Sequence, residues 1–319
     1  MGRAFVFPGQ GSQQVGMGRD LANAFAAARQ VHEEVDEALG QPLSRLMFEG
    51  PEAELLLTEN AQPAIMAASL AVVRVLQAEG GLALADHAAF VAGHSLGEYS
   101  ALAAAGTLGL ADAARLLKRR GQAMQAAVPL GEGAMAALIG LDLEAATAVA
   151  AAAAEDEDEI CAPANDNAPG QVVISGSAAA VDRAIALAAE QGAKRAVRLS
   201  VSAPFHCALM APAADVMAEA LAGVTLLPPL VPLVANVTAQ PVTEPDLIRR
   251  HLVEQVTAMV RWRESVQAMQ AAGVSELVEL GAGRVLTGLA RRIDRSLAAT
   301  AVNTPEDVAT FLGSLTSSS

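Results

Sequence analysis

The chain has 319 residues, roughly two to three times the usual length of a single domain, so we expect one large domain or a large domain that carries a smaller one. Hydrophobic residues make up 53% and charged residues 18%, which excludes extended disorder and favours a helix-rich globular fold. The 35 acidic and 21 basic side chains give a formal net charge of −14. This sign disfavours nucleic acid or an anionic membrane as the main partner.

Cysteine content and the first residues indicate the compartment. Cys161 and Cys207 are too few for a disulfide framework and fit a reducing cytoplasm. The start MGRAFVFPGQG lacks the apolar core of a signal peptide, and no stretch approaches about 20 apolar residues free of charged and turn-forming residues. We therefore expect a soluble cytoplasmic protein.

The first predicted elements are typical of a parallel α/β sheet. Arg3 to Phe7 predicts a short buried strand that ends at a Pro-Gly pair. Residues 88–92, AAFVA, predict a second buried strand, which runs through GHSLG into an alanine-rich helix that ends at Ala105. Strand, tight turn and helix form the repeating unit of such a sheet.

Between Gly133 and Ser200 the pattern changes to the order βαββαβ, which predicts an inserted ferredoxin-like unit of about 70 residues. Its predicted elements are a strand at Gly133–Gly140, a helix at Leu143–Ala154, strands around Ile160 and at Gln171–Ser175, a helix at Ala178–Gln191 and a strand at Lys194–Ser200. The α/β pattern then returns, with a helix after Pro212, a strand at Ser275–Leu280 and a last long helix from Arg284.

One serine lies at a predicted strand-to-helix turn. Residues 93–97 read GHSLG and match G-x-S-x-G, the nucleophile elbow. Such a turn strains the serine and leaves room only for small residues at i±2, which explains the two glycines. The Ser95 hydroxyl would lie at a helix N-terminus, where the dipole and the free N–H of Leu96 can stabilise an oxyanion. The alternative is a helix-capping serine between turn glycines.

A serine nucleophile needs a base, and the chain has five histidines. His206 is the candidate because it lies in an uncharged turn, residues 203–207, after a strand and before a helix; a structural histidine is the alternative. His94 adjoins the serine but would point away from its hydroxyl. Three others lie in polar segments that suit exposed positions: His32, His87 and His251. Cys207 is disfavoured as a nucleophile because neither an elbow nor a helix N-terminus is arranged to lower its pKa.

One basic residue is predicted to point inward. The triplet from Lys118 to Arg120 could be a single solvated charge run, but helical spacing separates its members. Arg120 has Leu116 and Met124 at i±4, so it emerges from the apolar stripe. An inward guanidinium needs an anion to offset its desolvation, and a carboxylate fits it in a bidentate manner.

Several motifs in one order resemble a known family: FPGQGSQ from Phe7, GHSLGEYSAL from Gly93, RGQAMQ from Arg120, SAPFHCALM from Ser202, PANDNAPGQVVISG from Pro163 and VLTGL from Val285. From end to end, the sequence resembles the malonyl-CoA:acyl-carrier-protein transacylases of bacterial fatty acid synthesis. The resemblance implies an α/β fold. An α/β-hydrolase-like large subdomain with a parallel-sheet core would span residues 1–130 and 202–319, and a ferredoxin-like small subdomain would be inserted at residues 131–201.

The resemblance also implies roles for individual residues. These are Ser95 as nucleophile, His206 as base, the backbone N–H groups of Gln10 and Leu96 as oxyanion hole, Arg120 as the cation for the malonyl carboxylate, and Gln255 as the backbone carbonyl that orients the base. Gln255 is identified by its spacing of seven residues before Trp262. Phe205, beside the base, could crowd the carbon between the two carbonyls and exclude a methyl branch, or it could be core packing.

The implied reaction is a two-step transfer. Ser95 takes the malonyl group from malonyl-CoA, and the phosphopantetheine thiol of acyl carrier protein then takes it from the serine. No metal or cofactor is implied, because malonyl-CoA is a substrate and phosphopantetheine belongs to the partner. We expect a monomer. The carrier protein is acidic, so docking needs cations near the cleft, or else these are scattered solvated charges. The candidates are Lys194, Arg195, Arg198 and Arg284.

Other functions fit part of the sequence. A serine hydrolase or thioesterase would use the same elbow, but such enzymes place an acid and then a histidine late in the chain, whereas a long segment follows His206. An acyltransferase for another acyl-CoA fits the same residues. Nucleotide binding, suggested by Gly9-Gln10-Gly11, fails because G-x-G-x-x-G needs a glycine where Gln14 stands. A catalytically silent scaffold would form no acyl adduct.

Overall fold

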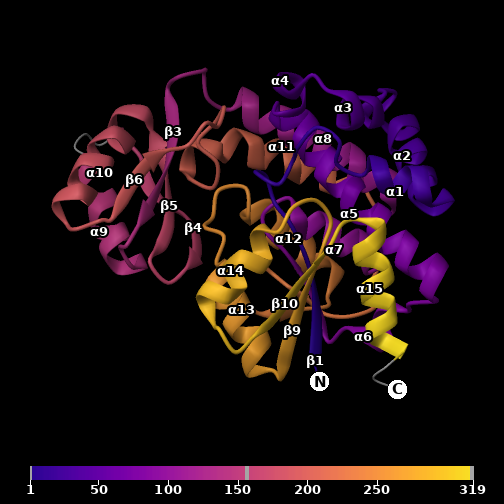
Figure 1. Cartoon of the computed structure of the whole chain (residues 1–319). Helices are drawn as coiled ribbons and strands as arrows, with labels where there is room; N and C mark the ends of the chain where they lie inside the picture. Colours follow the sequence, from indigo (N-terminus) through magenta and orange to yellow (C-terminus); the bar gives the residue numbers. More distant parts are fainter. Residues whose placement is uncertain (1, 155–157, 317–319) are drawn as a thin grey trace.

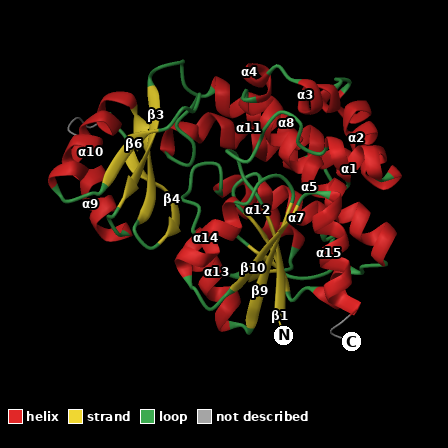
Figure 2. Cartoon of the chain, viewed as in Figure 1, coloured by secondary structure: helices red, strands yellow, loops and turns green. Residues whose placement is uncertain are grey.

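Two separate β-sheets organise the chain, as Figures 1 and 2 show. The computed structural model describes residues 2–154 and 158–316. In spatial order, the strands of the larger sheet are β10 (Ala298–Val302), β9 (Val274–Leu280), β1 (Gly2–Phe7), β2 (Phe90–Gly93), β7 (Leu233–Val234) and β8 (Pro241–Val242). The strands of the smaller sheet are β4 (Cys161–Ala168), β5 (Gln171–Ser177), β3 (Gly133–Ile139) and β6 (Arg195–Arg198). The predicted α/β class, a parallel-sheet core with a separate antiparallel sheet, is confirmed.

The larger sheet is parallel except for its last pair, β7 and β8. Strand β1 lies at its centre between β9 and β2, and Phe5 and Phe7 are fully buried. Burial on both faces explains why this strand is a continuous apolar run rather than an alternating one. Because Phe7 pairs in register with Gly93, the loops that follow β1 and β2 emerge side by side.

Helices cover both faces of this sheet. They are α1 (Arg19–Ala24), α2 (Ala26–Leu39), α3 (Leu43–Glu49), α4 (Glu52–Leu55), α5 (Thr58–Gly80), α6 (Leu84–His87), α7 (Gly97–Ala104), α8 (Leu110–Ala126), α11 (Ala211–Ala222) preceded by the 3-10 turn η1 (Ala208–Met210), α12 (Pro245–Glu254), α13 (Trp262–Ala271), α14 (Val285–Ile293) and α15 (Pro305–Thr316). Among the described residues, only α5 is long and apolar enough to cross a membrane, by length and composition alone. However, 83% of its most apolar window is buried, and it packs against α2 and α8 as a core helix.

The smaller sheet has every strand pair antiparallel and lies on the left of Figure 1 with α9 (Leu143–Ala153) and α10 (Ala178–Glu190). Its order, β4-β5-β3-β6, is the ferredoxin-like order that the βαββαβ pattern predicts. The sheet has its own apolar core, in which alanines of the two helices pack on Leu138, Val172 and Ile174. The boundaries at residues 131 and 201 stay a prediction.

Strand β4 attaches the smaller sheet to the rest of the molecule. The N–H of Asp166 donates to the carbonyl of Val260 at 3.0 Å, and the N–H of Val260 donates to the carbonyl of Ala164 at 2.9 Å. The Asp166 carboxylate, almost fully buried, also binds Arg263 at 2.8 Å. This edge therefore fixes β4 beside the segment that follows α12.

The predicted last long helix from Arg284 is wrong. Helix α14 ends at Ile293, and strand β10 and helix α15 follow it. The segment Ala298–Val302 is rich in alanine and favours helix by propensity, but it pairs in parallel with β9 at the sheet edge. Tertiary pairing therefore overrides local preference here.

Candidate active site

The GHSLG segment folds as a strained turn between β2 and α7. Ser95 has a φ of 53°, the left-handed region that non-glycine residues rarely adopt. A Cβ added at Gly93 would lie 1.9 Å from the carbonyl carbon of Gly97, and one added at Gly97 would lie 2.2 Å from the carbonyl oxygen of Phe7. Both glycines are therefore required by close backbone approach, as the predicted elbow demands.

Asn236, two residues after β7, holds the strained turn in place. Its Oδ1 accepts from the N–H of Ser95 at 2.8 Å, and its Nδ2 donates to the carbonyl of Gly93 at 2.7 Å. The N–H of Ser95 is thus occupied. Within the residues that the structure describes, the N–H groups of Leu96 and Gln10 have no hydrogen-bond acceptor, and Gln10 lines the adjacent cavity. These two donors are the ones predicted to form the oxyanion hole, a role that stays a prediction.

His206 meets the serine from the far side of the cavity. Its Nε2 lies 2.7 Å from Ser95 Oγ, and its Nδ1 lies 2.9 Å from the carbonyl oxygen of Gln255 and 3.2 Å from that of Ala258. Because a carbonyl only accepts, Nδ1 carries the proton and Nε2 can accept the serine proton. Burial, followed by the positive charge of Arg120, lowers the pKa of His206 to about 3. The ring is therefore neutral, as a base must be.

Arg120 points inward from α8, as its helical spacing predicts, and is only 1% exposed. Its Nη1 donates to Gln62 Oε1 at 2.8 Å, and its Nη2 donates to Gln255 Oε1 at 2.8 Å and to Ser95 Oγ at 3.1 Å. The guanidinium lies over the Tyr99 ring, 5.9 Å from its centroid. Its Nε has no partner among the described residues. A buried cation held by neutral oxygens is poised to accept an anionic ligand.

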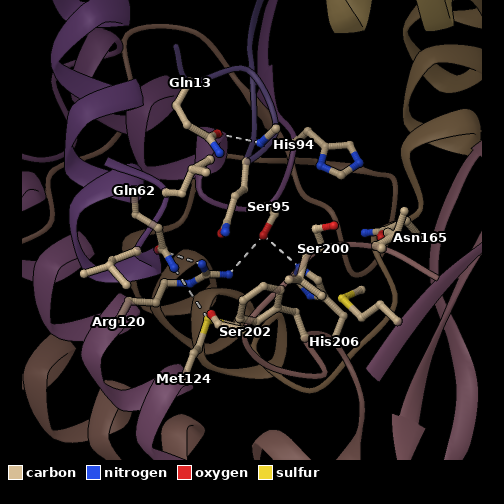
Figure 3. Close-up of a pocket in the computed structure, with 18 of the residues that line it drawn as sticks. Gln13, Gln62, His94, Ser95, Arg120, Met124, Asn165, Ser200, Ser202 and His206 are labelled. Carbon is tan, nitrogen blue, oxygen red and sulfur yellow. Dashed lines mark hydrogen bonds between the residues drawn. The ribbon is translucent and has the colours of Figure 1, made fainter. Parts of the chain in front are cut away.

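These groups converge on one cavity of about 550 Å³, shown in Figure 3. Ser95 Oγ points toward both the His206 ring and the Arg120 guanidinium. Apolar and polar side chains both line the cavity, with the larger share of its exposed surface apolar, and the smaller sheet supplies Met135 and Asn165. The apolar lining comprises Ala53, Leu56, Leu57, Met124, Met135, Leu199, Val201 and Phe205. An apolar slot with polar groups at its floor suits a linear acyl chain with a reactive end.

The other histidines lie away from the reacting serine. His94 points away from the hydroxyl, as predicted (Figure 3). Its Nε2 lies 2.8 Å from Asn167 Oδ1. The prediction that His32 and His251 are exposed is wrong, because they are only 3% and 8% exposed. Their helices turn these rings inward although the neighbouring residues are polar. His87 is half-buried.

Phe205 and Cys207 flank the base. Phe205 is 7% exposed and lines the cavity, so it contacts both the core and any bound acyl group; its role stays a prediction. Cys207 is 1% exposed, and burial raises the pKa of its thiol. A buried neutral thiol is a poor nucleophile, in agreement with the preference for serine.

The four candidate docking cations are all exposed, and they belong to two places in the fold. Lys194, Arg195 and Arg198 lie at or in β6, whereas Arg284 precedes α14. Arg198 pairs with Asp182 at 2.7 Å, and Arg284 lies 4.0 Å from a carboxylate of α15. Their role in docking stays a prediction.

Three polar side chains near the reacting groups were not among the predicted site residues: Gln62, Glu98 and Asn236. Asn236 lies between apolar residues, and Gln62 follows the polar residues at the start of α5; only their buried contacts mark them. Glu98 lies within the GHSLGEYSAL motif, so a charged residue in the first turn of a buried helix was the available signal.

A model of the acyl transferase domain family matches residues 4–316. The chain therefore belongs to the acyl transferase family, whose members are enzymes that move acyl groups. Within that family, the predicted resemblance to malonyl-CoA:acyl-carrier-protein transacylases is confirmed by relatives that match over nearly the full length.

Two such relatives illustrate the similarity in sequence. The malonyl CoA-acyl carrier protein transacylase of Escherichia coli (strain K12) is 50% identical over 309 residues, covering 97% of this chain and 98% of the relative. That of Bacillus subtilis (strain 168) is 46% identical over 305 residues, covering 96% of this chain and 94% of the relative.

Solved structures agree in fold. An acyl-carrier-protein-S-malonyltransferase from Bartonella henselae is 55% identical and superposes with a TM-score of 0.96, covering 99% of this chain and 100% of the other. A malonyl-transacylase in complex with a type II PKS acyl-carrier protein is 46% identical, with a TM-score of 0.94 over 98% of this chain and 100% of the other.

Proposed function

We propose that the protein transfers the malonyl group from malonyl-CoA to the phosphopantetheine thiol of acyl carrier protein through a malonyl-Ser95 intermediate. One observation carries the proposal. Ser95 Oγ lies within hydrogen-bond distance of both a neutral imidazole, at 2.7 Å, and a buried guanidinium, at 3.1 Å. The first suits attack on a thioester, and the second suits an acyl group that ends in a carboxylate. The names of the relatives support the same reaction.

In the first half-reaction, Ser95 Oγ attacks the thioester carbonyl carbon and its proton passes to His206 Nε2. The tetrahedral oxyanion then accepts hydrogen bonds from the N–H groups of Gln10 and Leu96. As the carbon–sulfur bond breaks, the CoA sulfur takes the proton from His206. In the second half-reaction, the thiol of the carrier protein gives its proton to His206 and attacks the serine ester, and the malonyl thioester leaves with Ser95 re-protonated.

We assign selectivity for malonyl to Arg120. Its neighbours Gln62 and Gln255 present neutral carbonyl oxygens, so the cation keeps its full charge for the substrate. An acetyl group lacks the carboxylate and leaves this buried charge uncompensated, which costs binding free energy in the transition state.

The proposal is tested by intact mass spectrometry after exposure to malonyl-CoA. Wild type should gain one malonyl group, and Ser95→Ala should gain none. Ser200→Ala is the matched control, because it removes another hydroxyl from the same cavity and should still be acylated. An adduct on Ser95→Ala, or hydrolysis of malonyl-CoA without transfer to any thiol, would contradict the proposal.

We also propose that Phe205 excludes a methyl branch on the acyl group. It lines the cavity directly beside the base. Phe205→Ser should raise kcat/KM for methylmalonyl-CoA relative to malonyl-CoA. If both values fall equally, Phe205 is core packing only.

We place the reaction in the cytoplasm, with a monomeric enzyme and no bound cofactor or metal. Both cysteines are free, which suits a reducing compartment. The two half-reactions balance with the chain's own serine and histidine, so they require no further group.

A further inference from the structure

A buried carboxyl group that the mechanism does not use lies directly beneath the reacting residues. Glu98 is in the first turn of α7, three residues after Ser95, and is 1% exposed. Its Oε2 accepts a close hydrogen bond from Gln255 Nε2, and a hydrogen bond from the backbone N–H of Asn236 also lowers the pKa of the carboxyl group. Burying a carboxyl group is costly unless it holds a partner in place, so its contact with Gln255 is informative.

The amide of Gln255 can work in only one orientation. Arg120 is a donor without acceptor capacity, so the Gln255 atom at 2.8 Å from Nη2 must be the carbonyl oxygen Oε1. The amide nitrogen then faces Glu98 and the carbonyl of Ser95, which it reaches at 3.1 Å. A flipped amide would set N–H groups against the guanidinium and an oxygen against the Glu98 carboxyl group. Glu98 and Arg120 therefore fix the amide from its two ends.

The side chain and the backbone of Gln255 serve different residues. Its backbone carbonyl binds His206, and that backbone is fixed separately because the Gln255 N–H donates to the carbonyl of His251 at 2.8 Å. Its side chain binds Arg120. Disturbing the amide therefore affects the guanidinium while the base keeps its orientation.

We propose that Glu98 is a positioning residue for substrate selection: by accepting from Gln255 Nε2, it holds the Gln255 carbonyl on Arg120 and so holds the guanidinium where it meets the acyl carboxylate. The proposal rests on the proposed function, since it concerns the malonyl-binding cation. The proposal depends on the oxygen of Glu98 that accepts from Gln255 Nε2. Burial raises the pKa of Glu98 to about 7, so both forms are populated near neutral pH, and each form offers an oxygen as an acceptor.

The test compares Glu98→Gln with Glu98→Met through the ratio of kcat/KM for malonyl-CoA to that for acetyl-CoA. Glu98→Gln keeps an acceptor oxygen and should leave the ratio within about threefold of wild type, whereas Glu98→Met should lower it about tenfold or more by freeing the amide. The acetyl value itself should change little. A merely structural role would lower both values together, because it reduces only the folded fraction.

A double-mutant cycle tests whether Glu98 acts on Arg120 through the Gln255 amide. Gln255→Leu should lower the ratio, and adding Glu98→Met should lower it no further, since Glu98 acts through that amide. Ser100→Ala is the control on the same helix, because it removes a buried hydroxyl that has no hydrogen-bond partner in the described part of the chain and should leave the ratio unchanged. If Glu98→Met does not fold, Glu98→Ala takes its place.

An unchanged ratio in Glu98→Met, an equal fall in Glu98→Gln and Glu98→Met, or additive effects in the cycle would each overturn the assignment. These outcomes differ from failure of the proposed function itself, in which wild type would show no transfer of malonyl to the carrier thiol.

Discussion

The two sheets contribute to the same cavity in different ways. The parallel sheet places reacting groups, because the register of β1 with β2 sets Gln10 and the elbow side by side. The antiparallel sheet supplies wall residues such as Met135 and Asn165. Strands buried on both faces hold atoms within hydrogen-bond distance, whereas a sheet attached along one strand shapes the space around them. Substitutions that disturb the parallel sheet should therefore lower kcat, and substitutions that disturb the antiparallel sheet should mainly change KM.

The sharpest test is a pair of glycine substitutions that cause similar backbone clashes. A Cβ at Gly97 would lie 2.2 Å from the carbonyl oxygen of Phe7, and one at Gly176 would lie 1.8 Å from that of Ile160 in the small sheet. Gly97→Ala should reduce kcat by roughly 10² or more by moving the elbow, while folded Gly176→Ala should mainly raise KM. Steady-state kinetics and circular dichroism check this. An equal fall in kcat for both variants would break the contrast.

Arg120→Ala should cause the next largest effect. It removes the cation that faces Ser95, so kcat/KM for malonyl-CoA should fall about 10²-fold while that for acetyl-CoA is kept or rises. Arg119→Ala is the control, since that neighbour is exposed on the same helix. An equal fall in kcat/KM for both substrates would show that Arg120 supports the fold rather than binding of the malonyl group.

The pH dependence of kcat/KM should show that His206 stays unprotonated at an unusually low pH. Since the pKa of His206 is lowered to about 3, the ring stays neutral as the pH falls, and kcat/KM at pH 5 should be close to its value at pH 7.5. A histidine of ordinary pKa would lose about thirty-fold over that range. Arg120→Gln removes the neighbouring positive charge and should move the acid limb to higher pH. An acid limb near pH 6.5 in wild type would contradict the buried environment.

The smallest effect is expected on the outer face of the small sheet. If Lys194 and Arg195 help to dock an acidic carrier protein, replacing both with alanine should slow transfer to the carrier a few-fold and weaken its salt dependence. The CoA half-reaction should be unaffected. Arg74→Ala, an exposed cation on α5, is the control. Equal loss in both half-reactions would indicate a general rather than a docking effect.

Local chemistry explains what the sequence alone could predict. The elbow serine, the inward arginine and the βαββαβ unit each depend on short-range spacing, and the structure places all three as expected. No helix is predicted from the sequence between residues 19 and 87, although α2 is amphipathic; α5 is buried nearly all round and carries no clear amphipathic stripe. Asn236 was missed for a related reason. Its bonds to the elbow join residues 141 and 143 positions apart in the sequence and leave no local pattern.

The hydrogen-bond partners of His206 Nδ1 also bear on which molecule can take the acyl group from Ser95, a thiol or water. Two neutral carbonyl oxygens, those of Gln255 and Ala258, take the place of a carboxylate, and their hydrogen bonds raise the pKa of His206 less than burial and the charge of Arg120 lower it. An imidazole with a lowered pKa is a weak base. A thiol, with a pKa of about 8.5, transfers its proton to His206 far more readily than water does, because the pKa of water is about 15.7. If Ser95 carries the acyl group as proposed, we expect its ester to react with a thiol and to resist water.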